Sequence, residues 1–246
     1  MAVSRRSAGT VLVGGILVLT SAALVYPKMI GVETNTSDTS RIIANTKYGP
    51  LTEADRDFVV KVRSAGLWEY PLGELAMQRG TTPAMKEAGA HLVVGHAGLD
   101  ELCRKIAPEL NITLPNKATP QQQEFVAVVN SKTGKDFDVT AVNIMRVTHG
   151  QIFPAIGKIR ASTQNTLVRQ LADLANDTVL DHITVLEKTG DVDFREVRYH
   201  QTTPPKLPTA DLTPPPPQPG EGMVVLKPRP DLNVNTAGTT PAPAVG

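Results

Sequence analysis

One glutamate and three histidines each interrupt the apolar stripe of a different predicted helix. They are Glu69, His96, His149 and His182. Neutral imidazoles and a carboxylate suit Zn, Fe, Mn or Cu, because imidazole nitrogen is a borderline-soft ligand and the carboxylate cancels part of the charge of the ion. The set predicts a site for one transition metal ion if the four side chains meet.

The same four residues also fit a polar layer that holds no ion. Buried polar groups need partners, and the glutamate could accept hydrogen bonds from the histidines and so fix the register of the helices. The sequence leaves both interpretations open. Glu74 and His91 lie near the set in the sequence but off the stripes, so we predict that both face solvent.

Four long helices must position these residues. Apolar side chains that recur at steps of three or four predict helices from Thr52 to about Arg79, Thr82 to about Pro108, Asp136 to Ala161 and Thr166 to Lys188, with a short helical piece at Gln121 to Asn130. Each of the four residues lies within about two turns of a helix midpoint, so a four-helix bundle would bring them to one level. The connection from Asn111 to Lys135 is long enough to make the second and third long helices parallel.

Composition excludes some classes of function. Residues 51–190 hold 15 Lys and Arg against 16 Asp and Glu, so no basic surface is predicted and we expect no nucleic-acid partner. The single cysteine, Cys103, lies on the apolar stripe, where a free thiol behaves as a small hydrophobic side chain. We therefore predict a structural role for this residue.

The first 26 residues resemble a membrane-directed segment. Two arginines precede 19 residues without a charge, Ala8 to Tyr26, which as a helix would nearly match the hydrocarbon thickness of a bilayer. Residues 1–26 are predicted to be a transmembrane anchor or a cleaved signal peptide. The positive charge favours export of the remainder, so we expect the bundle in the cell envelope, outside the cytoplasm, or secreted after cleavage.

Two regions beside the bundle are predicted to lack packed structure. Residues 27–50 have only scattered apolar side chains and are interpreted as a linker. Of the 20 prolines, 12 lie between Gln201 and Gly246, and proline-rich sequence favours extended chain. The predicted domains are therefore an anchor or signal segment, a linker, a bundle and a disordered tail, at residues 1–26, 27–50, 51–190 and 191–246.

Several motifs together resemble one protein family. The motifs are Phe58–Val60, Gly66–Ala76, Pro83–Lys86, Leu92–His96, Gly134–Asp138, Met145–His149 and His182. In order and spacing they resemble the bacterial envelope family known as domain of unknown function four-one-four-two, from about Leu51 to Gly190. The resemblance implies a ferritin-like four-helix bundle in an exported, often membrane-attached protein, and the four candidate ligands match the family pattern. Gly95 departs from that pattern, which commonly has an acidic residue there.

The sequence and the resemblance together predict an all-α fold, a ferritin-like up-down four-helix bundle with a long crossover, that is membrane-tethered and has a candidate site for one transition metal ion. No reaction is specified, and we favour a protein without enzymatic turnover, because the Glu-x-x-His pairs of di-iron bundles are missing from the sequence. One alternative is a non-catalytic envelope scaffold whose bundle surface and tail bind protein or wall polymer. Another is a metal-dependent oxidoreductase. The oligomeric state is not predicted.

Overall fold

The computed structural model describes residues 41–203 and 207–234, which are mostly helical, with seven helices and two short strands. The elements are β1 (Ile42–Thr46), β2 (Gly49–Thr52), α2 (Glu53–Arg79), α3 (Pro83–Glu109), α4 (Pro120–Asn130), α5 (Gly134–Ser162), α6 (Thr166–Lys188), α7 (Phe194–Thr202) and α8 (Thr209–Leu212). The predicted anchor or signal segment, residues 1–26, lies outside the described residues, as do residues 27–40 and 235–246. No helix in the described ranges has both the length and the apolar character of a membrane span.

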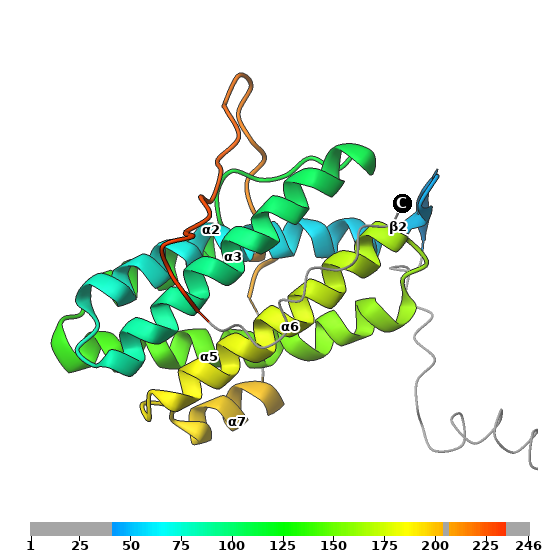
Figure 1. Cartoon of the computed structure of the whole chain (residues 1–246). Helices are drawn as coiled ribbons and strands as arrows, with labels where there is room; N and C mark the ends of the chain where they lie inside the picture. Colours follow the sequence, from blue (N-terminus) through cyan, green and yellow to red (C-terminus); the bar gives the residue numbers. More distant parts are fainter. Residues whose placement is uncertain (1–40, 204–206, 235–246) are drawn as a thin grey trace, which may run out of the picture. The chain divides into compact units, whose positions relative to one another are not determined.

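Four long helices, α2, α3, α5 and α6, pack side by side and form the body of the domain (Figure 1). α2 packs mainly against α3 and α5, and α6 packs mainly against the same two helices. The predicted helical class is confirmed. The bounds of these helices differ from the predicted ones by no more than two residues, because the apolar periodicity and the capping residues that define them are local features of the sequence.

Capping side chains define the starts of three of the four long helices. Thr52 Oγ1 accepts the N–H of Asp55 at 3.1 Å, and the Asp55 carboxylate accepts the N–H of Thr52 at 2.9 Å, so α2 begins with a reciprocal capping box. Thr82 caps α3 ahead of Pro83, and Asn165 caps α6. Each cap satisfies backbone N–H groups that have no partner within the helix.

The connection between α3 and α5 determines the directions of the helices. α2 and α3 are joined by three residues, as are α5 and α6, so each of these pairs is antiparallel. Residues 110–133, which include α4, join α3 to α5. The N–H of Thr81, just before α3, donates to the carboxylate of Asp138 at the start of α5 at 3.1 Å. The two helices therefore run in the same direction, as expected from the length of the connection.

Two of the three apolar clusters among the described residues follow one another along the helices. One cluster is formed by the N-terminal halves of α2 and α6 with the C-terminal halves of α3 and α5, and the other by the opposite halves. On α3, Leu92 belongs to one cluster and Leu99 to the other, and His96 lies between them. On α6, His182 lies in the same way between Val179 and Val185. A polar layer therefore separates two apolar regions.

A β-hairpin occupies the end of the predicted linker. β1 and β2 pair antiparallel, and Leu51 of β2 is 2% exposed within the core. Gly49, at φ +105°, adopts a backbone conformation that side chains disfavour. The prediction of a poorly ordered linker was wrong for residues 42–50, because the strands are stabilised by backbone hydrogen bonds to each other, which composition does not reveal.

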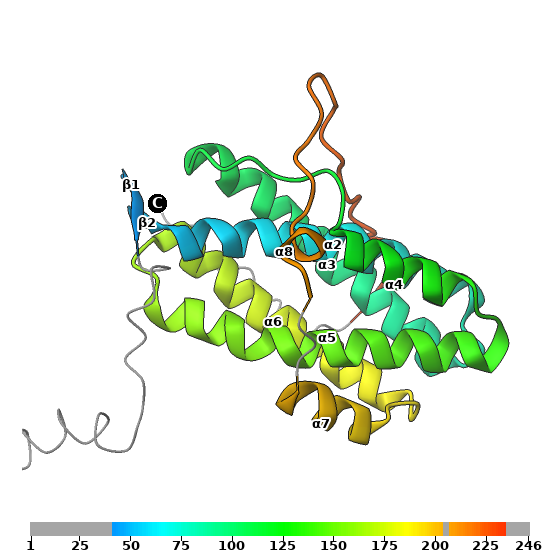
Figure 2. The ribbon, with the colours of Figure 1, turned by 180° about the vertical axis from the view of Figure 1, so that it is seen from behind.

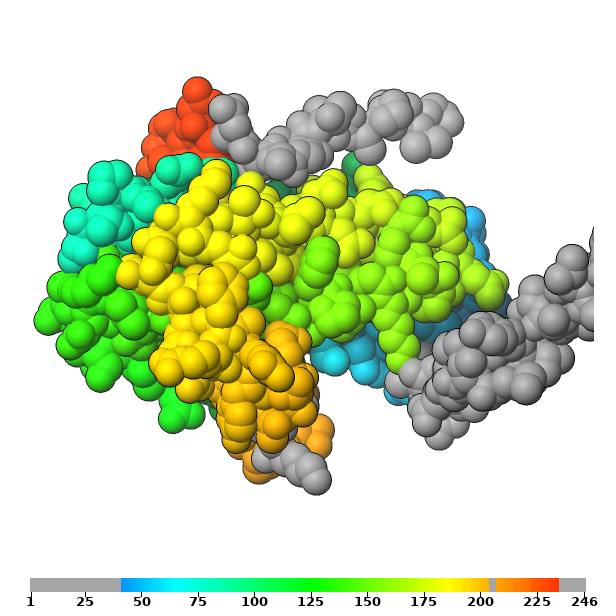
Figure 3. Space-filling model, turned by 90° about the horizontal axis from the view of Figure 1, so that it is seen from below, coloured from blue at the N-terminus to red at the C-terminus, as the bar shows by residue number. Residues whose placement is uncertain are grey.

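The proline-rich region is more ordered than predicted. α7 packs against α5 and projects from the face shown in Figure 3, and α8 lies beside α4 (Figure 2). Residues 222–232, here named the C-terminal segment, contact α2 and α3, where buried Leu226 packs against Tyr70 and Val93. The described part of the predicted tail therefore contains two helices and buried contacts, because residues between the prolines can still pack and form hydrogen bonds.

Candidate metal centre

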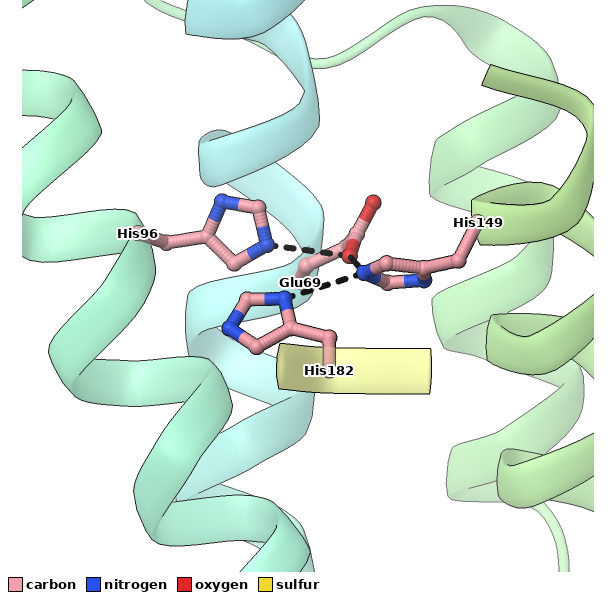
Figure 4. A group of neighbouring side chains, drawn as sticks. All are labelled: Glu69, His96, His149 and His182. Atoms are coloured by element: carbon pink, nitrogen blue, oxygen red, sulfur yellow. Dashed lines mark hydrogen bonds and ion pairs between the residues drawn. The ribbon is translucent and has the colours of Figure 1, made fainter. Parts of the chain in front are cut away.

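The four predicted ligand residues meet in the polar layer (Figure 4). Glu69 comes from α2, His96 from α3, His149 from α5 and His182 from α6. Each offers a ligand atom, and these atoms all lie within 4.8 Å of one another. None of the four residues is more than 5% exposed. The group is therefore compact and buried, and it could hold a metal ion.

The Glu69 carboxylate is at the centre of the contacts within this group. Its Oε2 lies 2.9 Å from His96 Nε2 and 3.1 Å from His149 Nε2. His149 Nε2 lies 3.0 Å from His182 Nδ1. The other oxygen of Glu69 points away from the imidazoles (Figure 4). One carboxylate oxygen and three ring nitrogens thus face a common space.

Backbone carbonyls define which nitrogen is protonated on two of the rings. His149 Nδ1 lies 2.7 Å from the carbonyl oxygen of Met145, and His182 Nε2 lies 3.1 Å from that of His91. A carbonyl oxygen can only accept, so both nitrogens donate. In neutral rings, His149 Nε2 and His182 Nδ1 then carry lone pairs. These lone pairs face each other next to Glu69 Oε2, with no N–H between them.

His96 differs from the other two histidines because no carbonyl defines its protonated nitrogen. Its Nδ1 is buried without a hydrogen-bond partner among the described residues. Its Nε2 faces Glu69 Oε2. This ring can therefore present either an N–H to the carboxylate or a lone pair to an ion.

Burial has a large effect on the charges in the layer. Burial lowers the pKa of His182 well below its ordinary value, and His96 and His149 lower it further. Burial also lowers the pKa of His149, although Glu69 opposes this shift. Burial alone would raise the pKa of the Glu69 carboxyl, but His149 and His96 hold it below its usual value. A carboxylate and neutral imidazoles are the forms that bind metal ions.

A cavity of about 340 Å³ borders the polar layer. Its lining includes Glu69, His96 and His149, together with residues of α4, α6 and α8. Three of the four candidate ligands can therefore be approached by a small molecule from one side.

Gly95 permits the close approach of α3 to His182. A Cβ at this position would lie 2.5 Å from His182 Nε2 and 2.7 Å from Thr178 Cγ2. The His182 ring is fully buried, so it has little room to move. An acidic side chain at position 95, which the resembled family commonly has, would not fit beside this placement of His182.

Sequence reasoning missed a buried pair next to the layer. His91 was predicted to face solvent but is 5% exposed, and its Nδ1 lies 2.7 Å from Asp181 Oδ2. The carbonyl of His91 is the one that accepts from His182. A signal was present, because His91 follows buried Ala88 by three residues and so lies on the same helix face. Glu74, also predicted to face solvent, is half-buried.

Comparisons with known proteins identify a family without an assigned activity. Residues 43–188 match the family described as "Domain of unknown function (DUF4142)". The matched region begins in β1 and ends with α6, so it contains the hairpin and all four candidate ligands. Neither the search of curated proteins nor the search of solved structures found a match. The match covers more than half of the sequence, and the chain therefore belongs to the DUF4142 family.

Proposed function

We propose that this domain binds one transition metal ion through Glu69, His96, His149 and His182. The observation that carries the proposal is that two imidazole nitrogens face each other with no donor between them. The lone pairs of two imidazoles face each other beside a carboxylate oxygen in a buried layer. Buried acceptors without a partner are costly, and a cation between them would turn a repulsive arrangement into an attractive one.

The surroundings of the histidines support the same proposal. Metal-bound histidines usually donate their second N–H to a carbonyl or carboxylate, which orients the ring. His149 donates to the carbonyl of Met145, and His182 donates to that of His91. His91 is itself held by Asp181. Two of the proposed ligands are thus oriented for an ion by groups outside the site.

The ligand set suits a single ion of Zn, Fe, Mn or Cu. Each of these ions accepts imidazole nitrogen and carboxylate oxygen. Di-iron bundles supply several glutamates, with a Glu-x-x-His motif on two helices, whereas this group has one carboxylate. We therefore propose a mononuclear site without ferroxidase activity.

The directions of the helices support a ferritin-like bundle. α2 and α3 are antiparallel, α3 and α5 are parallel, and α5 and α6 are antiparallel, with one long crossover between α3 and α5. Ferritin-like folds have one such crossover and place metal ligands on facing helices in the bundle core. We propose the same architecture for this domain.

The N-terminal sequence supports a proposal about location. An uncharged stretch, Ala8 to Tyr26, follows two arginines, as in exported proteins. We propose that the domain resides in the cell envelope, tethered or released after cleavage. In cell fractionation, recovery of the chain in the cytosol would contradict this location.

Elemental analysis of the purified full chain tests the metal proposal. After loading with each of the four metals in turn and removal of free ions, we expect one ion per chain for at least one metal. His96→Ala and His149→Ala should bind that metal at least about tenfold more weakly. His200→Ala removes a histidine of α7 outside the layer and should retain the ion. Equal metal content in all three variants, or no bound metal in the wild type, would refute the proposal.

A further inference from the structure

The cavity beside the polar layer has the size of a ligand site. Its volume of about 340 Å³ lies within the range of about 300–1,000 Å³ that is typical of small-molecule pockets. It is lined by Glu69, His96 and His149, but not by His182. A molecule in the cavity would therefore approach the layer on the side where Glu69, His96 and His149 line the cavity.

The walls of the cavity are mostly apolar. Phe58, Leu99, Ile152, Ile156 and Val179 belong to this lining. The polar exceptions include the amides of Gln121, Gln122 and Gln151, which can hydrogen-bond without adding charge. Such a lining suits a molecule that has an apolar body and one polar end.

The balance of charge at the site indicates what the polar end should be. A divalent ion bound by one carboxylate and three neutral imidazoles leaves one net positive charge in a buried group. A buried charge without a partner is costly. Among the described residues that line the cavity, Glu69 is the only acidic one, and Lys61 adds a positive charge. Apart from Glu69, which the charge balance already includes, the described lining therefore supplies no anion to neutralise the ion from the side of the cavity.

We infer that the cavity binds a small monoanion with an apolar body, such as a medium-chain carboxylate, whose anionic group completes the coordination of the metal ion. The inference rests on the proposed function, because the ion provides the charge that attracts the anion. The apolar walls hold the body of the ligand, and the layer binds its head.

The C-terminal region contributes one wall of this site. Leu212 of α8 and Pro214 line the cavity, and α8 lies beside α4, which supplies Gln121 and Gln122 (Figure 2). A region that the sequence predicts as a disordered tail therefore helps to enclose the ligand.

Visible absorption of the cobalt(II)-loaded full chain tests the inference, because the cobalt spectrum changes when a ligand joins the ion. Hexanoate and azide should each change the spectrum, whereas hexanamide, which has the same body without the charge, should not. A bound cobalt spectrum that neither anion changes would overturn the inference and leave the metal proposal intact. An equal response to hexanamide would overturn the requirement for an anion. Failure to bind cobalt or any of the other four metals would overturn both proposals.

A substitution inside the cavity tests where the apolar body binds. Ala65 of α2 lines the cavity, so Ala65→Trp should weaken hexanoate binding by at least about tenfold, while the smaller azide should bind nearly as in the wild type. Ala155→Trp places the same residue at an exposed position of α5 and should change neither. Ala65→Leu, a milder change, should give a smaller loss in the same direction. Unchanged hexanoate binding in both Ala65 variants would overturn the assignment to the cavity.

Discussion

Two buried polar clusters lie a few residues apart on α2 and α3, and they differ in whether their hydrogen bonds are complete. The first, here named the ionic cluster, is the Arg63 and Asp100 pair with its partners. Arg63 donates to Asp100, to the carbonyl of Pro115 at 3.1 Å and to that of Val224 at 2.7 Å. Asp100 accepts from Arg104 at 2.8 Å and from the N–H of Leu226 at 3.1 Å.

In the polar layer of Glu69 and the three histidines, the hydrogen-bond donors and acceptors do not match. In the ionic cluster every charge faces one of opposite sign, and donors match acceptors. In the polar layer, acceptors face acceptors, one nitrogen of His96 has no partner among the described residues, and a cavity adjoins the group. A complete cluster needs nothing further and stabilises the fold, whereas an incomplete one is where a ligand is expected.

The largest expected effect concerns the ionic cluster. Arg63→Leu leaves the Asp100 carboxylate buried with only part of its partners, so the free energy of unfolding should fall by about 3–5 kcal/mol. Urea unfolding followed by circular dichroism measures this loss. Arg56→Leu removes an arginine in a partly exposed ion pair of the same helix and should cost less than about 1 kcal/mol. Equal losses in the two variants would remove the distinction between the clusters.

Metal binding should raise the free energy of unfolding by somewhat less than Arg63→Leu lowers it. With free metal at about 100 times the dissociation constant, the free energy of unfolding should rise by about 2.7 kcal/mol. Thermal unfolding with metal and with a chelator measures the difference. Gly95→Ala, which displaces His182, should reduce the stabilisation, whereas Gly157→Ala, at a position with open space around it, should preserve it. A metal-independent melting temperature in the wild type would contradict the proposed site.

The C-terminal segment should contribute to stability through the packing of Leu226. Its side chain packs against α2 and α3, and its backbone N–H donates to Asp100. Leu226→Ala keeps this N–H but removes most of the buried side chain, so it should lower the free energy of unfolding by about 2 kcal/mol. Leu180→Ala, at a position that is 53% exposed, should have little effect. If both variants unfold at the wild-type urea concentration, the segment does not stabilise the domain.

A substitution in the polar layer, measured without metal, should change the free energy of unfolding least. Any change should stabilise the protein, whereas Arg63→Leu and Leu226→Ala destabilise it. Glu69→Gln supplies an N–H donor beside the two facing lone pairs of His149 and His182, which have no donor between them, so the stability of the metal-free protein should stay the same or rise by up to about 1 kcal/mol. The same variant should lose the stabilisation by metal. Denaturant unfolding in chelator measures the first effect. A loss of about 2 kcal/mol or more would show that the layer is complete without an ion.

The thiol of Cys103 gives a control for accessibility of the core. Burial raises the pKa of this thiol to about 12, so at pH 8 it should stay protonated in the folded protein. Iodoacetamide, which reacts with thiolates, should label Cys103 only after unfolding. Rapid labelling of the native protein would indicate that the core beside α2 opens in solution.

Much of the fold could be predicted from the sequence because its signals are local. Thr52 and Thr82 cap helices within three residues of their own positions, and Gly190 follows α6 at φ +76°. That the four ligand residues lie at the same depth in the bundle could be predicted from their positions near the midpoints of the helices. The hairpin and the described part of the tail could not be predicted, because their stability depends on partners distant in the sequence.

Local periodicity was sufficient for the helices and for the identity of the four candidate ligands, although not for the buried His91. Only the tertiary structure shows that the carbonyls of Met145 and His91 orient two rings so that their lone pairs converge. The cavity and the contact between Leu226 and Asp100 are also tertiary features. The physical reason is that the hydrogen bonding of a group depends on every atom around it. Met145 lies on the same helix as His149, but His91 and the other ligand residues of the layer come from segments far apart in the chain.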